Sequence, residues 1–503
     1  MSLRDLYLAK DVRALDRLII DEFSVDGYAL MTRAGQAAFS YLQQYWPSCK
    51  KITVVCGRGN NAGDGYVVAR LAHEAGYKIQ VFGLVGFDYL QGDALLAARA
   101  AADAGVAMID CERNFPANGL DGNDVLVDAI FGIGLDRNVE GRWLAAINAI
   151  NDSDCAVMAL DIPSGLSADT GTVLGAAVKS DCTISFIALK QGLFTGHARA
   201  YCGEVHLADL AVPDEARNQV EVTAQLINYR DIYADLLLPR HECSYKSQHG
   251  HVLLVGGENG MSGALQLAGE AALRCGAGLV SLATRQQHAA LLSIVRPELM
   301  CHGVEERSHL NPLLKKASLV AVGPGLGGFA WGQAMFSALL ETGLPMVVDA
   351  DGLNFLAKEK TYRTNWVLTP HPGEAARLLG VSIGEIEADR FSAVRALQTL
   401  YGGVVVLKGA GTLICYGENN VIDVCGDGNP GMAVAGMGDV LTGVIASLIA
   451  QKLSFSDAIR LGVCLHSAAA DLAAKQGTRG MLASDLFAHL RMLINSLPSG
   501  SEI

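Results

Sequence analysis

A glycine-rich segment that leads into an apolar run carries the clearest chemical signal. Residues 426–450 read GDGNPGMAVAGMGDVLTGVIASLIA, and Asp439 stands where the loop gives way to a predicted helix. The backbone amides of residues 435–438, at the N-terminus of that helix, would form an anion site. A carboxylate beside such a site can act as a base toward a substrate hydroxyl near a phosphate. Asp439 could instead be an ordinary acid in the first turn of a helix, although a helix start needs no loop containing five glycines.

Three further strand ends in the same half carry polar residues. Residues 322–328 (VGPGLGG) predict turns that need a positive φ or a close backbone approach. The segment TPHPGEAARLLG places His371 and Glu374 at a helix start, where Glu374 could equally be a first-turn acid. Residues 404–414 (VVVLKGAGTLI) read as strand, tight turn and return strand, so Lys408 lies either in a plain hairpin or beside a nucleotide phosphate. No second histidine lies at ligand spacing from His371, so no metal role is predicted for it.

In the first half, the segment VVCGRGNNAGDGY follows a predicted strand and opens a predicted helix. Ligands of open α/β sheets bind at such strand ends. The glycine spacing G-x-G-x-x-x-G differs from the dinucleotide fingerprint, and no G-K-S/T of a P-loop occurs. The turn could be purely structural, but Asn60, Asn61 and Asp64 add a dense set of hydrogen-bonding and oxygen-ligand groups.

Two later strand ends add oxygen atoms to the same edge. The segment VLVDAIFGIGLDRN places Asp128 after a strand with a second glycine-rich loop behind it, and MALDIPSG places Asp161 and Ser164. Each aspartate alone could cap a turn. Because parallel strands end on one side of a sheet, we expect Asn61, Asp128 and Ser164 to offer hard-oxygen ligands to a monovalent or hard divalent cation. Lys190, in FIALKQGL, is predicted either to lie on the surface or to meet a phosphate.

Alternating apolar and helical segments predict the elements that carry these residues. A helical region is predicted over residues 11–46, and strands alternate with helices after it. This alternation is typical of an α/β protein that has helices on both faces of parallel sheets. In the first half we expect a Rossmann-like, doubly wound sheet. The polar, irregular stretch 212–248 interrupts the alternation, which restarts at His251, and the two halves show no repeat of each other. The predicted domains are therefore 1–215 and 246–503, with a junction at 216–245.

Composition narrows the class of protein. Of 503 residues, 50% are hydrophobic and 18% charged, which excludes a disordered chain. Lys and Arg number 39 against 52 Asp and Glu, a net charge of −13, so a nucleic-acid partner is not expected. No apolar stretch reaches membrane-spanning length, the N-terminus resembles no signal peptide, and the 12 cysteines are scattered without metal spacing. We expect a cytoplasmic protein with reduced thiols, no membrane association and homo-oligomeric assembly.

Together these motifs resemble two known families. The second half resembles the ribokinase-like superfamily in its G-x-G-D at 436–439, its P-H-x-x-E and its K-G-x-G-T turn. Within that superfamily, NPGMAVAGMGDVLTG is similar to the ADP/ATP-dependent NAD(P)H-hydrate dehydratases. In the first half, GRGNNAGDG, DAIFGIG and DIPSG resemble the NAD(P)H-hydrate epimerases. The order of the halves is that of the bifunctional repair enzymes.

The resemblance implies a repair reaction. Water added across the C5–C6 bond of the nicotinamide ring of NADH or NADPH gives R and S hydrates. The epimerase domain would interconvert them. The dehydratase domain, with a ribokinase-like α/β fold, would phosphorylate the hydroxyl of the S hydrate and eliminate phosphate. Fused prokaryotic forms usually convert ADP to AMP, although ATP is an alternative, and Mg²⁺ is expected with the nucleotide.

The resemblance also implies roles for individual residues. Potassium would be held by Asn61, Asp128 and Ser164. The hydrate in the epimerase domain would be bound by Asn60, Asn61, Ala62, Gly63, Asp64, Gly132, Ile133, Gly134, Leu135, Asp136, Arg137, Asn138 and Asp161. Asp161 is also our choice for the catalytic proton-transfer residue. Ala62 stands where the family often has a second glycine, which casts doubt on the geometry of this loop.

In the dehydratase domain, Asp439 fits the catalytic base. The hydrate would be contacted by Ala264, Gly323, Gly325, His371 and Asp439. The nucleotide would be held by Lys408, Gly409, Ala410, Gly411, Thr412 and Gly438.

Two other functions remain open at this point. One is a ribokinase-like kinase acting on a vitamin-precursor alcohol and fused to a ligand-binding Rossmann-like domain. The other makes the N-terminal domain a ligand-sensing or scaffold module, which its polar strand ends argue against.

Overall fold

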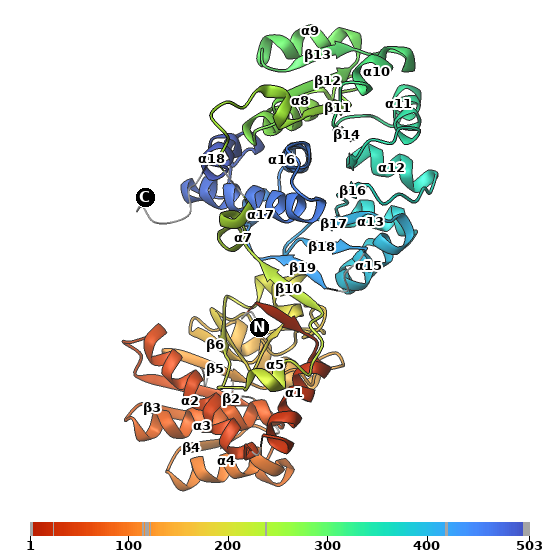
Figure 1. Cartoon of the computed structure of the whole chain (residues 1–503). Helices are drawn as coiled ribbons and strands as arrows, with labels where there is room; N and C mark the ends of the chain where they lie inside the picture. The colour runs from red at the N-terminus through yellow and green to blue at the C-terminus, as the bar shows by residue number, and fades with distance from the viewer. Residues whose placement is uncertain are drawn as a thin grey trace. The chain divides into compact units, whose positions relative to one another are not determined.

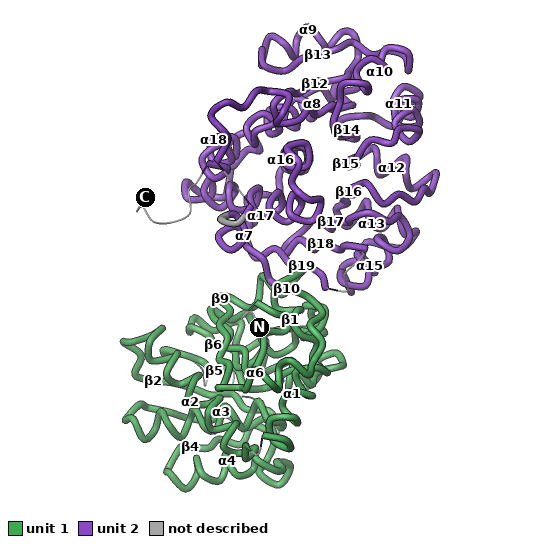
Figure 2. Tube along the Cα trace, viewed as in Figure 1, with its two compact units in different colours: residues 1–225 green, residues 226–503 purple. Residues whose placement is uncertain are grey.

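The computed structural model describes residues 4–23, 25–112, 115, 120, 122–236, 239–417 and 421–495. The chain divides into two compact units, Met1–Gln225 and Leu226–Ile503 (Figure 2). The predicted junction 216–245 contains that boundary together with strand β10 (Ala224–Ile227) and helix α7 (Tyr229–Leu236). Each unit is an α/β structure built on its own parallel sheet, as the alternation of elements predicts (Figure 1).

The first unit is built on seven parallel strands in the order β4-β3-β2-β5-β6-β7-β9. The direction of winding reverses between β2 and β5, which is the switch point where ligands of such sheets bind. The strands span Lys51–Cys56 (β2), Lys78–Gly83 (β3), Ala107–Asp110 (β4), Val125–Ala129 (β5), Ala156–Leu160 (β6), Cys182–Phe186 (β7) and Glu204–Ala208 (β9). Their helices are α1 (Ala9–Asp21), α2 (Gly27–Tyr45), α3 (Asn60–Glu74), α4 (Gly92–Asp103), α5 (Gly141–Asn151) and α6 (Asp214–Arg217).

Two sequence predictions about the first unit need correction. The single helical region at 11–46 is two helices, because Asp26 caps α2 by accepting a bond from Ala29 N at 3.0 Å. The glycine-rich segment is not a loop that precedes the predicted helix, because α3 begins at Asn60 and contains most of that segment. Its glycines serve close packing: a Cβ at Gly63 would lie 2.5 Å from Met31 Sδ, and one at Gly65 would lie 2.5 Å from Ala129 Cβ.

The chain begins with a short strand that the sequence did not reveal. Strand β1 (Asp5–Tyr7) pairs antiparallel with β10 at Ala224 and parallel with β8 (Leu189–Lys190). Tyr7 lies opposite Lys190 in that register. The pairing ties the start of the chain to the segment that carries Lys190.

The second unit has seven parallel strands in the order β13-β12-β11-β14-β15-β16-β17, extended by antiparallel β18 and β19. Its switch point lies between β11 and β14. The strands span His251–Val255 (β11), Leu279–Thr284 (β12), Met300–Gly303 (β13), Leu319–Val322 (β14), Met346–Val348 (β15), Trp366–Leu368 (β16), Val404–Leu407 (β17), Leu413–Tyr416 (β18) and Ile422–Cys425 (β19).

The helices of the second unit enclose that sheet. They are α8 (Ser262–Arg274), α9 (Gln286–Val295), α10 (Arg307–Leu314), α11 (Ala330–Leu340), α12 (Ala350–Lys358), α13 (Pro372–Leu379), α14 (Ile383–Ala388), α15 (Arg390–Tyr401), α16 (Met437–Ala450), α17 (Phe455–Ala473) and α18 (Leu486–Leu493). Helix α16 is buried along almost its whole length and packs against α8, where a Cβ at Gly443 would lie 2.0 Å from Ala268 O. The apolar run of residues 440–450 therefore forms a core helix.

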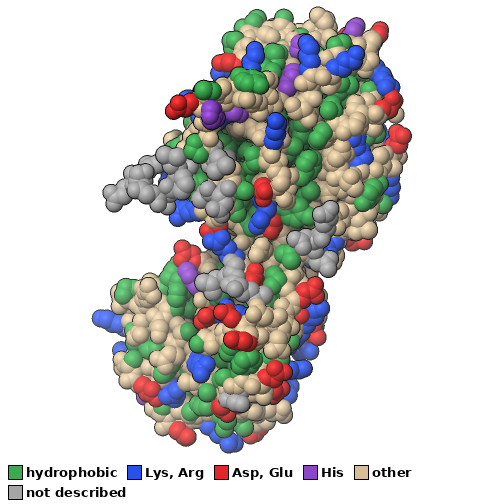
Figure 3. Space-filling view, viewed as in Figure 1, with side chains coloured by type: hydrophobic (Ala, Val, Ile, Leu, Met, Phe, Trp, Pro, Cys, Tyr) green, Lys and Arg blue, Asp and Glu red, His purple; other side chains and the backbone are tan. Residues whose placement is uncertain are grey.

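Aliphatic side chains fill both cores, and all 12 cysteines are free thiols. No helix among the described residues is long and apolar enough to cross a membrane. On the face shown in Figure 3, acidic and basic side chains are interspersed over each unit.

Candidate active sites

The switch point of the first sheet opens into a cavity of about 710 Å³. Most of the hydrate-binding residues predicted from the resemblance line it: Asn60, Asn61, Asp64, Gly132, Ile133, Gly134, Leu135, Asp136, Arg137 and Asp161. Ala62, Gly63 and Asn138 do not line this cavity, and neither do Asp128 and Ser164. Ala62 is a buried helical residue without a positive φ, so alanine is accommodated there without strain.

The three predicted cation ligands meet around the backbone of Phe131. Asp128 is fully buried and accepts bonds from the backbone N (2.8 Å) and the hydroxyl (2.6 Å) of Ser164. The same hydroxyl also lies 3.2 Å from Phe131 O, to which Asn61 Nδ2 donates at 3.0 Å. Burial raises the pKa of Asp128 to about 6, against the opposing effect of its bonds from Ser164.

One buried oxygen in this cluster has no partner. Asn61 Oδ1 makes no hydrogen bond within the described residues, although buried amide oxygens are almost always paired. A carboxylate, a hydroxyl, a backbone carbonyl and this unpaired amide oxygen form the all-oxygen donor set that hard cations take. The residues present therefore fit a bound cation.

Lys190 contradicts both predictions made for it. Its side chain is completely buried, so it neither lies on the surface nor reaches a phosphate. The ammonium pairs with Asp161 and also donates to Ser185 Oγ at 3.0 Å and Phe186 O at 2.9 Å. The sequence places Lys190 after a strand but could not show that β6 and β7 lie side by side, which is what brings it to Asp161.

Two further carboxylates face the same cavity. Asp64 lies on α3 and Asp16 on α1, and the sequence offered no signal for Asp16. Burial, followed by the charges of Asp161 and Asp16, holds the pKa of Asp64 well above its usual range, and Lys190 offsets part of this effect. Burial likewise raises the pKa of Asp16. Three carboxyl groups, Asp16, Asp64 and Asp161, thus face one cavity.

The second candidate site lies at the switch point of the second sheet. Gly323 and Gly325 follow β14 with φ values of 128° and 58°, which confirms that this turn needs positive φ. A Cβ at Gly323 would lie 1.7 Å from Asp349 O, and one at Gly325 would lie 2.4 Å from Met261 O. The turn therefore packs closely between Asp349 and Met261, the residue that precedes α8. Ala264 lies in the first turn of that helix.

Asp439 lies in the first turn of α16, directly after a left-handed glycine. Gly436 has a φ of 91° and begins the helix, so the amide groups at this end point away from any intrahelical partner. Burial, followed by the negative charge of Asp349, raises the pKa of Asp439 to about 6, and Lys408 opposes the shift. A half-buried carboxylate at a helix N-terminus suits the base predicted from the sequence.

A buried ion pair that the sequence did not reveal anchors this site. Lys408 Nζ lies 2.6 Å from Asp349 Oδ1 and 3.7 Å from Glu374 Oε2. Thr442 Oγ1 donates to Asp349 Oδ2 at 3.0 Å and links the pair to α16. Burial disfavours the charged form of Lys408, but the negative charges of Asp349 and Glu374 outweigh that effect. The pKa of Lys408 therefore lies above its usual value.

The predicted nucleotide residues surround that lysine. A Cβ at Gly438 would lie 3.3 Å from Lys408 Nζ, so a side chain at this position would crowd the ammonium. In the turn after β17, Gly409 and Gly411 have positive φ values of 139° and 64°, and Thr412 Oγ1 donates to Gly409 O at 3.1 Å. The buried Arg390, which the sequence did not single out, holds the turn by donating to Lys408 O at 3.1 Å.

His371 takes part in a helix cap as well as facing the site. Its Nδ1 accepts from Gly373 N at 3.0 Å, and Glu374 Oε2 accepts from His371 N at 2.8 Å. Burial, together with the positive charges of Lys408 and Arg377, lowers the pKa of His371. Glu374 is thus the expected first-turn acid and also a neighbour of Lys408, so both interpretations of it hold.

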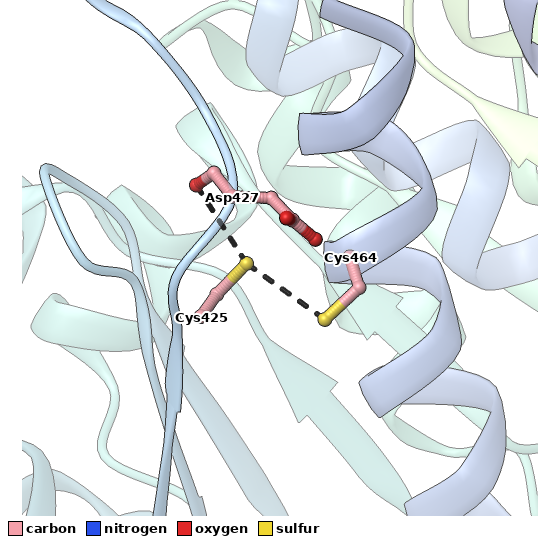
Figure 4. A group of neighbouring side chains, drawn as sticks. All are labelled: Cys425, Asp427 and Cys464. Carbon is pink, nitrogen blue, oxygen red and sulfur yellow. Dashed lines mark hydrogen bonds between the residues drawn. The ribbon is translucent and has the colours of Figure 1, made fainter. Parts of the chain in front are cut away.

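A sulfur-rich cluster lies near the loop that leads to α16. Figure 4 shows Cys425, at the end of β19, facing Cys464 on α17 with 3.8 Å between the Sγ atoms, and Asp427 beside them. One ligand atom from each residue lies within 4.8 Å of the others. Two thiols and a carboxylate are one ligand short of a tetrahedral zinc site, and no fourth metal-binding side chain among the described residues joins the group.

These two units and their sites define an α/β protein with two ligand-binding sheets. Residues 252–491 match the family model described as NAD(P)H-hydrate dehydratase, and residues 27–192 match the model described as YjeF-related protein N-terminus. The chain belongs to the family of bifunctional NAD(P)H-hydrate repair enzymes.

Full-length relatives carry that assignment. The bifunctional NAD(P)H-hydrate repair enzyme of Coxiella burnetii is 47% identical over 97% of this chain and 99% of its own length. The enzyme of that name from Escherichia coli is 43% identical over 97% of this chain and 94% of its own. A solved ribokinase-like superfamily protein from Enterococcus faecalis is 29% identical, with a TM-score of 0.50 over 54% of this chain and 95% of its own. The alternative of a vitamin-precursor kinase is not favoured by these matches.

Proposed function

We propose that this chain repairs hydrated nicotinamide dinucleotides in two steps. The first unit interconverts the R and S hydrates of NADH and NADPH. The second unit dehydrates the S hydrate and converts ADP to AMP and phosphate. The observation that carries the proposal is the pairing of two switch-point sites in one chain, since full-length relatives of this family have the same two-part architecture.

In the first unit we assign the cavity at the β2–β5 switch point to the hydrate and the oxygen cluster beneath it to potassium. Asn61, Asp128 and Ser164 would hold the ion, and the unpaired Asn61 oxygen supports this assignment. When bound, potassium neutralises the Asp128 carboxylate and fixes the backbone around Phe131. The hydrate then meets the α3 N-terminus and the loop 132–138.

In the second unit Asp439 is the proposed base. It removes the proton from the C6 hydroxyl of the S hydrate, and that oxygen attacks the β-phosphorus of ADP and releases AMP. Loss of phosphate from C6 and of a proton from C5 then restores the C5–C6 double bond. Lys408 and the helix N-terminus at Gly438 stabilise the transferring phosphoryl group, and Mg²⁺ is expected to accompany the nucleotide.

Product analysis distinguishes this proposal from the kinase alternative. The purified chain is incubated with a mixture of R and S hydrates of NADH and with ADP. The proposal predicts recovery of the near-ultraviolet absorbance of NADH and release of one AMP and one inorganic phosphate per NADH. A kinase would accumulate a stable phosphorylated product. Absence of NADH recovery with either ADP or ATP would refute the dehydratase assignment.

A further inference from the structure

Lys190 lies beneath the cavity of the first unit with no donor to spare. Its ammonium has three N–H groups, and three acceptors surround it: Asp161, Ser185 Oγ and Phe186 O. The side chain is fully buried, so it cannot touch a ligand in the cavity. Lys190 therefore acts on a bound hydrate through the carboxyl groups around it, and Asp161 is the one that it contacts directly.

Asp161 is held in one orientation at the cavity wall. Its φ of 65° is in the left-handed region, which a residue other than glycine adopts at an energetic cost. Its backbone N donates to Ile184 O at 2.7 Å, and its Oδ1 accepts from Phe186 N at 3.2 Å as well as from Lys190. The other oxygen, Oδ2, faces Gly132, where a Cβ would lie 3.4 Å away. One carboxylate oxygen is thus anchored and the other points toward the cavity.

Asp64 faces the same cavity from α3 in a different electrostatic environment. The buried ammonium pairs with Asp161 and not with Asp64. Burial and the charge of Asp161 keep the pKa of Asp64 well above its usual range, which favours the protonated form of this carboxyl group. One carboxyl group paired with an ammonium and a second, buried one without that pair are the usual arrangement for a base and an acid at one site.

We infer that Lys190 is a positioning residue that aims the Asp161 carboxylate at the cavity, so that Asp161 acts as the base and Asp64 as the acid of epimerisation. The inference rests on the epimerase function proposed for this unit. Asp161 and Asp64 then carry the two proton transfers, and Lys190 orients Asp161.

The chemistry follows from the position of the hydroxyl. In the hydrate, C6 carries both the hydroxyl and the ring nitrogen N1. Asp161 takes the hydroxyl proton, the C6–O bond becomes a carbonyl, and the C6–N1 bond breaks with its electron pair moving to N1. Asp64 gives its proton to N1. Rotation about the C5–C6 bond turns the other face of the carbonyl toward N1, and ring closure by the reverse proton transfers yields the other epimer.

Other charged groups around the cavity, together with Lys190, Asp161 and Asp64, determine how the rate of epimerisation depends on pH. Asp16 on α1 lies among the carboxylates that interact with Asp64. The remaining charged residues that line the cavity are Arg13, Arg58, Asp93, Asp136, Arg137 and Arg142. None of these pairs with Lys190 or Asp161 in the described structure, so removal of Lys190 changes the nearest charge to Asp161 and leaves the rest in place.

The test follows the disappearance of the R hydrate of NADH in the full chain, with potassium and ADP present. We compare the unaltered chain with Lys190→Ala, Asp64→Asn and a control, Lys179→Ala, which removes an exposed lysine of the same unit. Asp64→Asn preserves shape, so it reports on chemistry even if Lys190→Ala folds poorly. Dehydration of pure S hydrate by each variant verifies that the second unit is intact.

We expect epimerisation to fall about 100-fold in Lys190→Ala and in Asp64→Asn, the range for losing a positioned proton-transfer group. In Lys190→Ala the acidic limb of the pH–rate profile moves to higher pH, and added methylammonium restores part of the rate. Lys179→Ala retains the full rate. These shifts distinguish a positioning role from simple loss of structure.

The inference is overturned if Asp64→Asn consumes the R hydrate at the original rate. It is also overturned if Lys190→Ala keeps an unmoved pH profile and does not respond to methylammonium. By contrast, if the unaltered chain consumes R hydrate no faster than the spontaneous reaction, the epimerase function itself fails.

Discussion

At the scale of single residues, each unit pairs a lysine with an aspartate in its site, and the lysine is fully buried in the first unit and mostly buried in the second. Lys190 pairs with Asp161 in the first unit, and Lys408 pairs with Asp349 in the second. A strand-end position made Asp161 and Lys408 predictable from the sequence. The pairings were not, because Lys408 and Asp349 are 59 residues apart and meet only through the order of their strands. Removing one partner of such a pair costs roughly 3–5 kcal/mol by leaving a buried charge, so the folding of each such variant is checked beside its rate.

Asp439→Asn is the residue-scale test of the dehydratase base. The amide keeps the shape of the side chain but cannot accept the hydroxyl proton, so we expect S-hydrate dehydration to fall at least about 100-fold. ADP binding, measured by calorimetry, should stay within a few-fold of the original. Loss of ADP binding together with activity would mean that Asp439 maintains the loop and is not the base.

The pH dependence of dehydration follows from the same carboxylate. Burial and Asp349 raise the pKa of Asp439 to about 6, and a base works only when ionised. We therefore expect kcat/KM for the S hydrate to be flat above that pH and to fall about tenfold per pH unit below it, with ADP and Mg²⁺ saturating. A profile that stays flat from pH 7 to pH 5 would contradict the assignment.

Potassium dependence tests the oxygen cluster of the first unit. Replacing potassium by a large organic cation should slow R-hydrate consumption, because the Asp128 carboxylate loses its counter-charge. Asn61→Leu removes the unpaired amide oxygen and should raise the potassium concentration needed for half-maximal rate. Equal rates with and without potassium in the unaltered chain would remove the ion from the proposal.

At the scale of elements, the glycines separate what sequence patterns can and cannot indicate. The positive φ of Gly323 and Gly325 was predictable, because a G-x-G turn after a strand favours the left-handed region. The glycines of α3 were wrongly predicted to form a loop. They lie in a helix, where the absence of a side chain lets Met31 and Ala129 of other elements pack closely against it. Local spacing reports local conformation, whereas a packing requirement depends on a distant neighbour.

Helix α16 provides a stability test of that distinction. A side chain at Gly443 would run into Ala268 O of α8, so Gly443→Val should lower the free energy of unfolding of the second unit by about 1–3 kcal/mol or more. Gly384→Ala is the matched control. Gly384 lies in α14, and its Cβ would have no neighbour closer than 3.8 Å, so alanine should be neutral or slightly stabilising. Equal unfolding free energies for the two variants would show that α8 and α16 do not pack this closely.

At the scale of the whole molecule, the sequence was sufficient for the α/β class and for the family. It was sufficient because the hydropathy alternation is regular and the motifs stand at strand ends. It could not supply the strand β1, the break between α1 and α2, or Asp16 and Asp349, which depend on contacts between distant segments. The net charge of −13 gives no attraction for anionic substrates, so binding must rest on local amides, helix N-termini and a few lysines.

The central claim is that each unit carries one of two consecutive reactions, and one measurement tests it directly. An equal mixture of R and S hydrates of NADH is given ADP and either the unaltered chain, Asp161→Ala or Asp439→Ala, and NADH absorbance is followed to completion. We predict full recovery with the unaltered chain, rapid recovery of only the S half with Asp161→Ala, followed by the slow spontaneous conversion, and no recovery with Asp439→Ala. Full and rapid recovery with Asp161→Ala, or any rapid recovery with Asp439→Ala, would contradict the account.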